Sequence, residues 1–198
     1  MQPTLSGEYL LSKVEMASRR IMGDDPAHGW PHVVRVMHNA ELIVYNEGVE
    51  VDWVVLRVSI YLHDTGRFIS GGEHHVVKSV SYATNLLEKL GVSKDFIRAV
   101  THAIEAHSYS YGVRPSTIEA MVLSDADKLD ALGAIGIARV FHHGCLNNRS
   151  FEDSVSHMAE KLLELPSKMI LRYSRRLAEE RVSIIRAFIE QYRREIMQ

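Results

Sequence analysis

Hydrophobic residues recur along most of the chain at spacings of three and four. In the segment PHVVRVMHNAELIV, Val33, Val36, Met37, Ala40 and Val44 fall on one face of a helix. The same spacing runs through Val80, Ala83, Leu86, Leu87 and Leu90, through Phe96, Ile97, Val100 and Ile104, and through Leu177, Val182, Ile185, Phe188, Ile189 and Tyr192. This pattern predicts amphipathic helices that each turn one face toward a core.

One segment, VDWVVLRVSIYL, has a composition typical of a strand because it is rich in β-branched residues. Its apolar and polar residues do not alternate strictly, and no partner strands are evident. Trp53, Leu56, Ile60 and Leu62 fit a buried helix at least as well. Proline and glycine are sparse and fall between the helical segments. We therefore predict an all-α fold that forms one domain over residues 1–198.

Composition and charge narrow the class of protein. Of the 198 residues, 46% are hydrophobic and 24% are charged, which is typical of a globular domain with a core. The net charge of −2 argues against a protein built to bind nucleic acid. The single cysteine, Cys145, cannot form an internal disulfide. The N-terminal stretch has no apolar signal core and no run is long enough to span a bilayer. We expect a cytoplasmic protein that does not contact membranes.

Ionisable residues interrupt the apolar faces at four places. They are His28 and His32, the doublet His63-Asp64, His102 and His107, and the trio Asp125, Asp127 and Asp130. An isolated buried carboxylate is costly, so it is protonated, paired or bound to a cation. For the aspartates, capping of a helix start or an ion pair with Lys128 stands beside metal binding. A single helix-start histidine is usually only hydrogen-bonded, and a doublet at a helix end suits either a metal or a core hydrogen bond.

The combination is more specific than its parts. His32, His63, Asp64 and Asp127, all in helical segments, supply four nitrogen and oxygen donors for a divalent metal. No set of cysteines is present, which excludes a structural zinc site of the usual kind. Metal sites that are built from imidazole and carboxylate ligands and keep open coordination positions are typically catalytic.

The order His32, His63-Asp64, Asp127 resembles the HD superfamily of metal-dependent phosphohydrolases. The segments HGWPHVVRVMHNA, LHDTGR, HAIEAHSYS and DADKLDALGAIGIARVF are similar to its small single-domain YpgQ/YedJ-like subgroup, over about residues 20–195. The resemblance implies an HD-type helical bundle with these four residues as metal ligands. It implies hydrolysis of a nucleoside triphosphate to the monophosphate and pyrophosphate, with manganese favoured. The same ligand types also accept magnesium, cobalt, nickel, iron or zinc.

Further roles follow from this resemblance and from position in the sequence. Asp64 is expected to bind the metal and to orient the attacking water. The cations near the ligands, Arg67, Lys78 and Lys128, are candidates to hold phosphate, and His75, His102 and His107 to bind phosphate or transfer a proton. His28 is a candidate to support the site or to cap the turn. We expect one metal ion, although these histidines leave a second one open.

Two other functions remain open at this point. One is a phosphodiesterase or 5′-nucleotidase on the same fold. The other is a non-catalytic HD module that binds a nucleotide. In each case the expected partner is a phosphorylated small molecule, and a homodimer is compatible with a helical surface of this size.

Overall fold

In a computed structural model, all regular secondary structure in the part that the structure describes, residues 6–197, is helical. The α-helices are α1 (Gly7–Met22), α2 (Trp30–Glu47), α3 (Trp53–Leu62), α4 (His75–Lys89), α5 (Lys94–His107), α6 (Ile118–Asp130), α7 (Gly133–Leu146), α8 (Phe151–His157) and α9 (Arg172–Ile196). Short helical turns are η1 (Thr65–Phe68), η2 (Tyr109–Tyr111), η3 (Met158–Leu162) and η4 (Leu165–Lys168). No strand forms among the described residues, so the prediction of an all-α fold is confirmed.

The segment with strand-like composition is the buried helix α3. Asp52 caps it, because its side chain accepts hydrogen bonds from the backbone N–H groups of Val54 and Val55 at 2.9 and 3.1 Å. Leu56, Ile60 and Leu62 are fully buried, as the sequence predicts. The prediction that Trp53 is buried is wrong. It lies in the first turn of the helix, where 38% of the residue is exposed.

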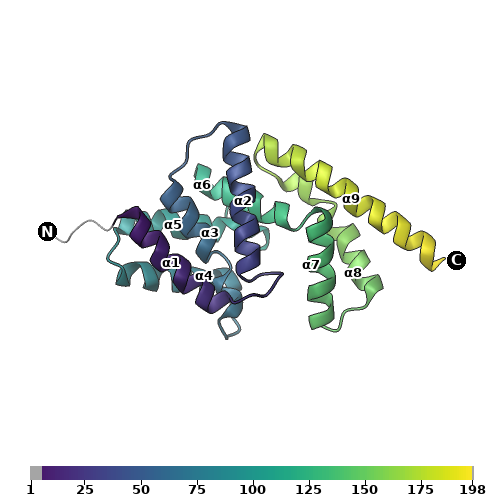
Figure 1. The fold of residues 1–198 in the computed structure, drawn as a ribbon, viewed down its shortest axis with the longest axis horizontal. Helices are drawn as coiled ribbons and strands as arrows, with labels where there is room; N and C mark the ends of the chain where they lie inside the picture. Colours follow the sequence, from purple (N-terminus) through teal and green to yellow (C-terminus); the bar gives the residue numbers. More distant parts are fainter. Residues whose placement is uncertain (1–5, 198) are drawn as a thin grey trace.

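The core consists of two clusters of buried side chains. One joins α1, α3, α4 and α5 and includes Leu62, Leu87 and Ile104. The other joins α2, α6 and α9 and includes Leu123 and Ile185. Figure 1 shows α1, α3, α4 and α5 on one side of α2, and α7, α8 and α9 on the other. Helices α2 and α6 pack against each other between these groups, so residues distant in sequence meet at their contact.

A glycine fixes the turn after α3. A Cβ atom on Gly66 would collide with the backbone of His75 and Ser79, so only glycine lets η1 lie against the start of α4. The Gly66 N–H donates to the Ser79 hydroxyl at 2.8 Å, which holds this close approach. The turn therefore brings His75 beside Asp64. None of the helices in the described ranges is long and apolar enough to cross a membrane.

Candidate metal centre

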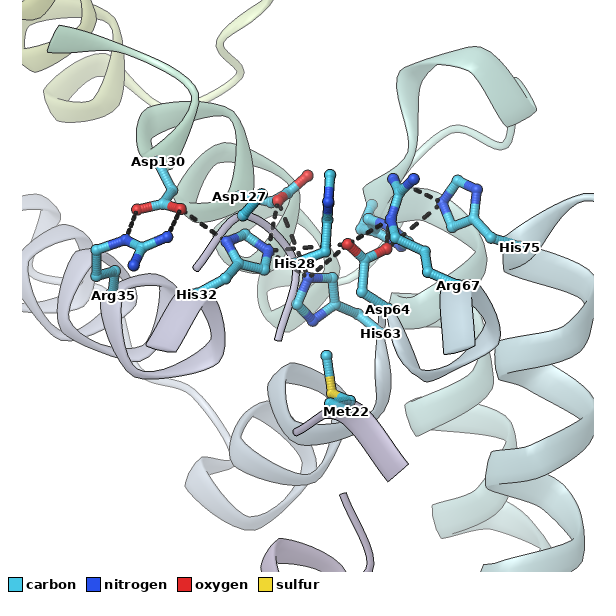
Figure 2. Close-up of polar contacts among 12 residues, drawn as sticks. Met22, His28, His32, Arg35, His63, Asp64, Arg67, His75, Asp127 and Asp130 are labelled. Atoms are coloured by element: carbon cyan, nitrogen blue, oxygen red, sulfur yellow. Dashed lines mark hydrogen bonds and ion pairs between the residues drawn. The ribbon is translucent and has the colours of Figure 1, made fainter. Parts of the chain in front are cut away.

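The four predicted metal ligands converge where α2, α3 and α6 meet. His32 lies in the first turn of α2, His63 and Asp64 follow the last turn of α3, and Asp127 lies on α6. The His32 Nε2 atom is 3.2 Å from His63 Nε2 and 3.3 Å from Asp127 Oδ1. Asp64 Oδ2 is 3.9 Å from both ring nitrogens. Figure 2 shows the four side chains pointing toward one another.

Hydrogen bonds on the far side of each ring set the direction of its lone pair. His32 Nδ1 is 2.7 Å from Asp130 Oδ2, and His63 Nδ1 is 2.8 Å from the Ile60 carbonyl oxygen. Carboxylate and carbonyl oxygens only accept, so both rings carry a proton on Nδ1. The two Nε2 atoms then face each other at 3.2 Å. Each is the ring nitrogen left free to bind a cation, and such outer hydrogen bonds on Nδ1 are typical of metal-binding histidines.

Asp64 carries the second sign of a cation site. Its Oδ2 atom accepts a hydrogen bond from Arg67 Nε at 2.6 Å. Its Oδ1 atom is buried and has no hydrogen-bond partner within residues 6–197. This atom lies 3.5 Å from His75 Nε2 and 3.7 Å from His107 Nε2. An unpartnered buried carboxylate oxygen is costly, and a bound cation removes that cost.

Two sets of donors are close enough to hold an ion. One consists of His32, His63 and Asp127, and the other of His63, Asp64 and His107. In each set the ligand atoms lie within 4.8 Å of one another. Imidazole nitrogen and carboxylate oxygen suit a divalent transition metal. The residues present therefore fit the kind of metal that the sequence predicts.

The electrostatics favour the ligand form of most of these groups. Burial lowers the pKa of His63 to about 4, so the ring is neutral at pH 7. Burial would raise the pKa of Asp64, but the Arg67 guanidinium and His63 hold it well below its usual range. The pKa of Asp127 is also lowered, since its hydrogen bond with His32 outweighs burial. His32 is the exception, because Asp127 and Asp130 outweigh burial and raise its pKa.

Asp130 supports the site and is a residue whose role the sequence did not reveal. It is 2% exposed and accepts the His32 Nδ1 proton, as Figure 2 shows. Arg35 donates to it at 2.7 and 3.0 Å, and Arg139 donates at 2.8 Å. Burial opposes ionisation, yet these partners lower its pKa to about 2. Its spacing of three residues from Asp127 places both side chains on one face of α6, and this spacing could have indicated the role from the sequence.

A pocket of about 590 Å³ opens over the metal ligands. The predicted residues that line it are Asp64, Arg67, His107, Asp127 and Lys128, together with His28. Its other polar walls include Ser108, Tyr109, Ser110, Arg139, His157, Glu160, Lys161, Glu164 and Lys168, none of which was predicted as a site residue. Lys168 Nζ lies 5.4 Å from the centre of the Tyr109 ring, so η2 and η4 meet at this pocket.

The remaining residues that were predicted to bind substrate do not line the pocket. Lys78 Nζ donates to the carbonyl oxygen of Ile69 at 2.6 Å, and Lys78 does not line the pocket. His102 Nε2 accepts from the Ser116 N–H at 3.0 Å, also away from the pocket. His75 lies beside the pocket lining, with its Nε2 atom 3.3 Å from Arg67 Nη2.

Lys128 and Asp125 flank the predicted ligand Asp127, and each forms hydrogen bonds with backbone groups. The Lys128 ammonium donates to the Ser124 carbonyl oxygen at 3.0 Å, and burial lowers its pKa. Asp125 accepts from the N–H groups of Ile170 and Leu171, at 3.0 and 2.8 Å for its closest oxygens. Asp125 therefore caps neither α6 nor α9, and it ties the segment just before α9 to α6.

Comparisons with known proteins place the chain in one family. The family model described as HD domain matches residues 29–132. The uncharacterized protein YpgQ of Bacillus subtilis (strain 168) is 32% identical over 185 residues, which cover 87% of this chain and 86% of that protein.

Solved structures show the same similarity. A crystal structure of Bacillus subtilis YpgQ in complex with ADP has a TM-score of 0.74 and 28% identity, covering 94% of this chain and 97% of that one. A predicted HD superfamily hydrolase from an uncultured Thermotogales bacterium has a TM-score of 0.67 and 29% identity, covering 93% and 92%. The prediction of an HD-type fold is confirmed, and the chain belongs to the HD domain family as a relative of YpgQ.

Proposed function

We propose that the protein is a metal-dependent phosphohydrolase that acts on nucleotides. Its metal would be held by His32, His63, Asp64 and Asp127. The observation that carries this proposal is the convergence of the His32 and His63 Nε2 atoms on the carboxylate of Asp64, whose buried Oδ1 atom has no hydrogen-bond partner among the described residues. This arrangement lies at a pocket large enough for a nucleotide. We also propose that residues 1–198 form one HD domain, of which residues 1–5 and 198 lie outside the described part.

The chemistry divides between the ion and the side chains. A divalent ion bound at this site would lower the pKa of a water molecule and polarise a phosphoryl oxygen. Asp64 would help to hold the ion and orient the water, because its carboxylate lies between the ring nitrogens and the Arg67 guanidinium. Arg67 is 36% exposed at its side chain and lines the pocket, so it holds a phosphate group as negative charge develops. His107 faces the same space and takes part in proton transfer.

The preferred substrate in this proposal is a nucleoside triphosphate, cleaved to the monophosphate and pyrophosphate with Mn²⁺. The relative YpgQ was crystallised with ADP, and the Thermotogales relative is described as a predicted hydrolase. Within this chain, the pocket carries the cations Arg67, Lys128, Arg139, Lys161 and Lys168. Several cations beyond one metal site suit a chain of phosphates better than a single phosphate.

Product analysis tests this proposal directly. Metal-free protein is supplied with Mn²⁺ and with nucleoside mono-, di- and triphosphates, and products are separated by anion-exchange chromatography. We expect monophosphate and pyrophosphate from triphosphates. Orthophosphate from a monophosphate would replace this reaction with a 5′-nucleotidase. Nucleotide binding without any product would leave a binding module.

A matched pair of variants locates the reaction. Asp64→Ala removes a proposed ligand, so we expect hydrolysis to be lost. Asp24→Ala removes an exposed carboxylate on the loop before α2 and should keep the wild-type rate. Unchanged turnover in Asp64→Ala would refute the proposed metal site.

A further inference from the structure

A second, smaller chamber adjoins the pocket over the metal ligands. It has a volume of about 220 Å³ and shares His28, Arg139 and His157 with the larger pocket. Two further basic residues, His143 and Arg149, complete its polar lining, and the other lining residues are apolar or glycine. Within the part of the chain that the structure describes, no carboxylate lines this chamber. Its wall thus has two arginines and three histidines but no acidic side chain.

The sequence after α7 turns Arg149 back toward this chamber. Asn148 has a φ of 53°, a left-handed conformation that asparagine tolerates better than most residues. The Arg149 N–H then donates to the Gly144 carbonyl oxygen at 2.8 Å. A Cβ atom on Gly144 would lie 2.8 Å from the Ser154 hydroxyl oxygen, so glycine allows α8 to pack closely here. The turn and this close packing place Arg149 over the last turn of α7.

The positive charge of Arg149 is not compensated by the protein. Its guanidinium has no hydrogen-bond or ion-pair partner among residues 6–197, whereas Arg139 donates to Asp130 at 2.8 Å. The charge of Arg149 also affects the pKa values of two neighbouring histidines. Burial lowers the pKa of His143 and of His157, and the Arg149 guanidinium is the next cause of the lowering in both. A partly buried cation without a counter-charge is stabilised by an anionic ligand.

We infer that this chamber binds the pyrophosphate portion of a nucleoside triphosphate, and the pyrophosphate released from it, with Arg149 as a main contact. This inference rests on the proposed function. A volume of 220 Å³ is the space of roughly seven water molecules at about 30 Å³ each, which suits two linked phosphate groups. The nucleoside is left to the larger pocket. The chamber thereby selects triphosphates over monophosphates.

The first test measures binding of inorganic pyrophosphate to the full-length, metal-free protein by isothermal titration calorimetry. We expect Arg149→Ala to weaken binding by about tenfold or more, as for loss of a charge-assisted hydrogen bond. Arg149→Lys should recover part of the affinity because it keeps the charge. Arg20→Ala, which removes an exposed arginine in the last turn of α1, should bind as the wild type does. Equal affinity in Arg149→Ala and wild type would overturn the inference, as would a wild type that binds no pyrophosphate.

The second test separates this inference from the proposed reaction. In the Mn²⁺ enzyme, Arg149→Ala should raise KM for a triphosphate by about tenfold or more and leave the inhibition constant of the monophosphate product unchanged. Arg149-dependent pyrophosphate binding in a protein that hydrolyses no nucleotide would support the chamber and refute the reaction. Hydrolysis of triphosphates with pyrophosphate binding indifferent to Arg149 would support the reaction and refute the chamber.

Discussion

Replacing Asp130 by asparagine tests how the metal centre is held in place. The substitution keeps the shape of the side chain but removes the charge that accepts the His32 Nδ1 proton at 2.7 Å and two arginine side chains. Loss of such an outer partner typically lowers metal affinity by about 10- to 100-fold. The change also costs stability. A pKa lowered from 3.8 to about 2 corresponds, at about 1.4 kcal/mol per pKa unit, to about 2 kcal/mol near neutral pH.

Two measurements check these numbers. Mn²⁺ affinity at pH 7 is obtained by titration calorimetry, and the free energy of unfolding of metal-free protein by urea denaturation. Because the folded-state pKa of Asp130 is depressed, its stabilisation is complete above about pH 4 and is lost as the pH falls toward about 2. The stability difference between wild type and Asp130→Asn should therefore shrink over that range. Asp24→Asn, at an exposed carboxylate, is the matched control. Wild-type Mn²⁺ affinity in Asp130→Asn would refute the role assigned to Asp130.

Three further outcomes are expected. Mn²⁺ at about 100 times its Kd should stabilise the protein by about 2.7 kcal/mol, seen as a rise in Tm that EDTA reverses and that Asp64→Ala abolishes. Asp125→Ala should lower the free energy of unfolding by about 2 kcal/mol or more in urea denaturation, because the N–H groups of Ile170 and Leu171 lose their acceptor. Metal analysis of protein saturated with Mn²⁺ and then desalted should give one ion per chain, and a ratio of two would contradict this.

The helices were predictable because their apolar spacing is local information. The face of α2 that the sequence predicts includes Val33, Val36 and Ala40, which are fully buried. Ser93 caps α5 by accepting the Phe96 N–H at 3.2 Å, and a serine just before an apolar face is likewise local information. The strand-like composition of α3 was ambiguous because propensity alone decides little when most of a segment is buried.

The four proposed metal ligands could be predicted only as a set. Each of His32, His63, Asp64 and Asp127 has an ordinary structural explanation by itself, and it was their order along the chain that resembled a family. Nearness in sequence is a poor guide to nearness in the fold. It suggested Lys78 as a phosphate contact, yet the Lys78 ammonium donates its hydrogen bond to the Ile69 carbonyl oxygen.

The basic residues that line the pocket depend on packing that the sequence does not display. Arg139 reaches the site because α7 folds back against α6 and its side chain meets Asp130. Lys161 and Lys168 line the pocket from η3 and η4, segments that follow α8 and carry no motif of their own. These two lysines line the pocket only because the C-terminal segments that carry them fold over it.

The position of His63 supports the expectation of one metal ion. This residue belongs to both sets of candidate donors, the one with His32 and Asp127 and the one with Asp64 and His107. Its Nδ1 atom is committed to the Ile60 carbonyl oxygen, so only the single Nε2 lone pair is available. One lone pair binds one ion, and two ions would therefore leave one of the sets without its third ligand. A single ion near His63 could instead be held with the neighbouring carboxylates of both sets, in line with the four ligands proposed.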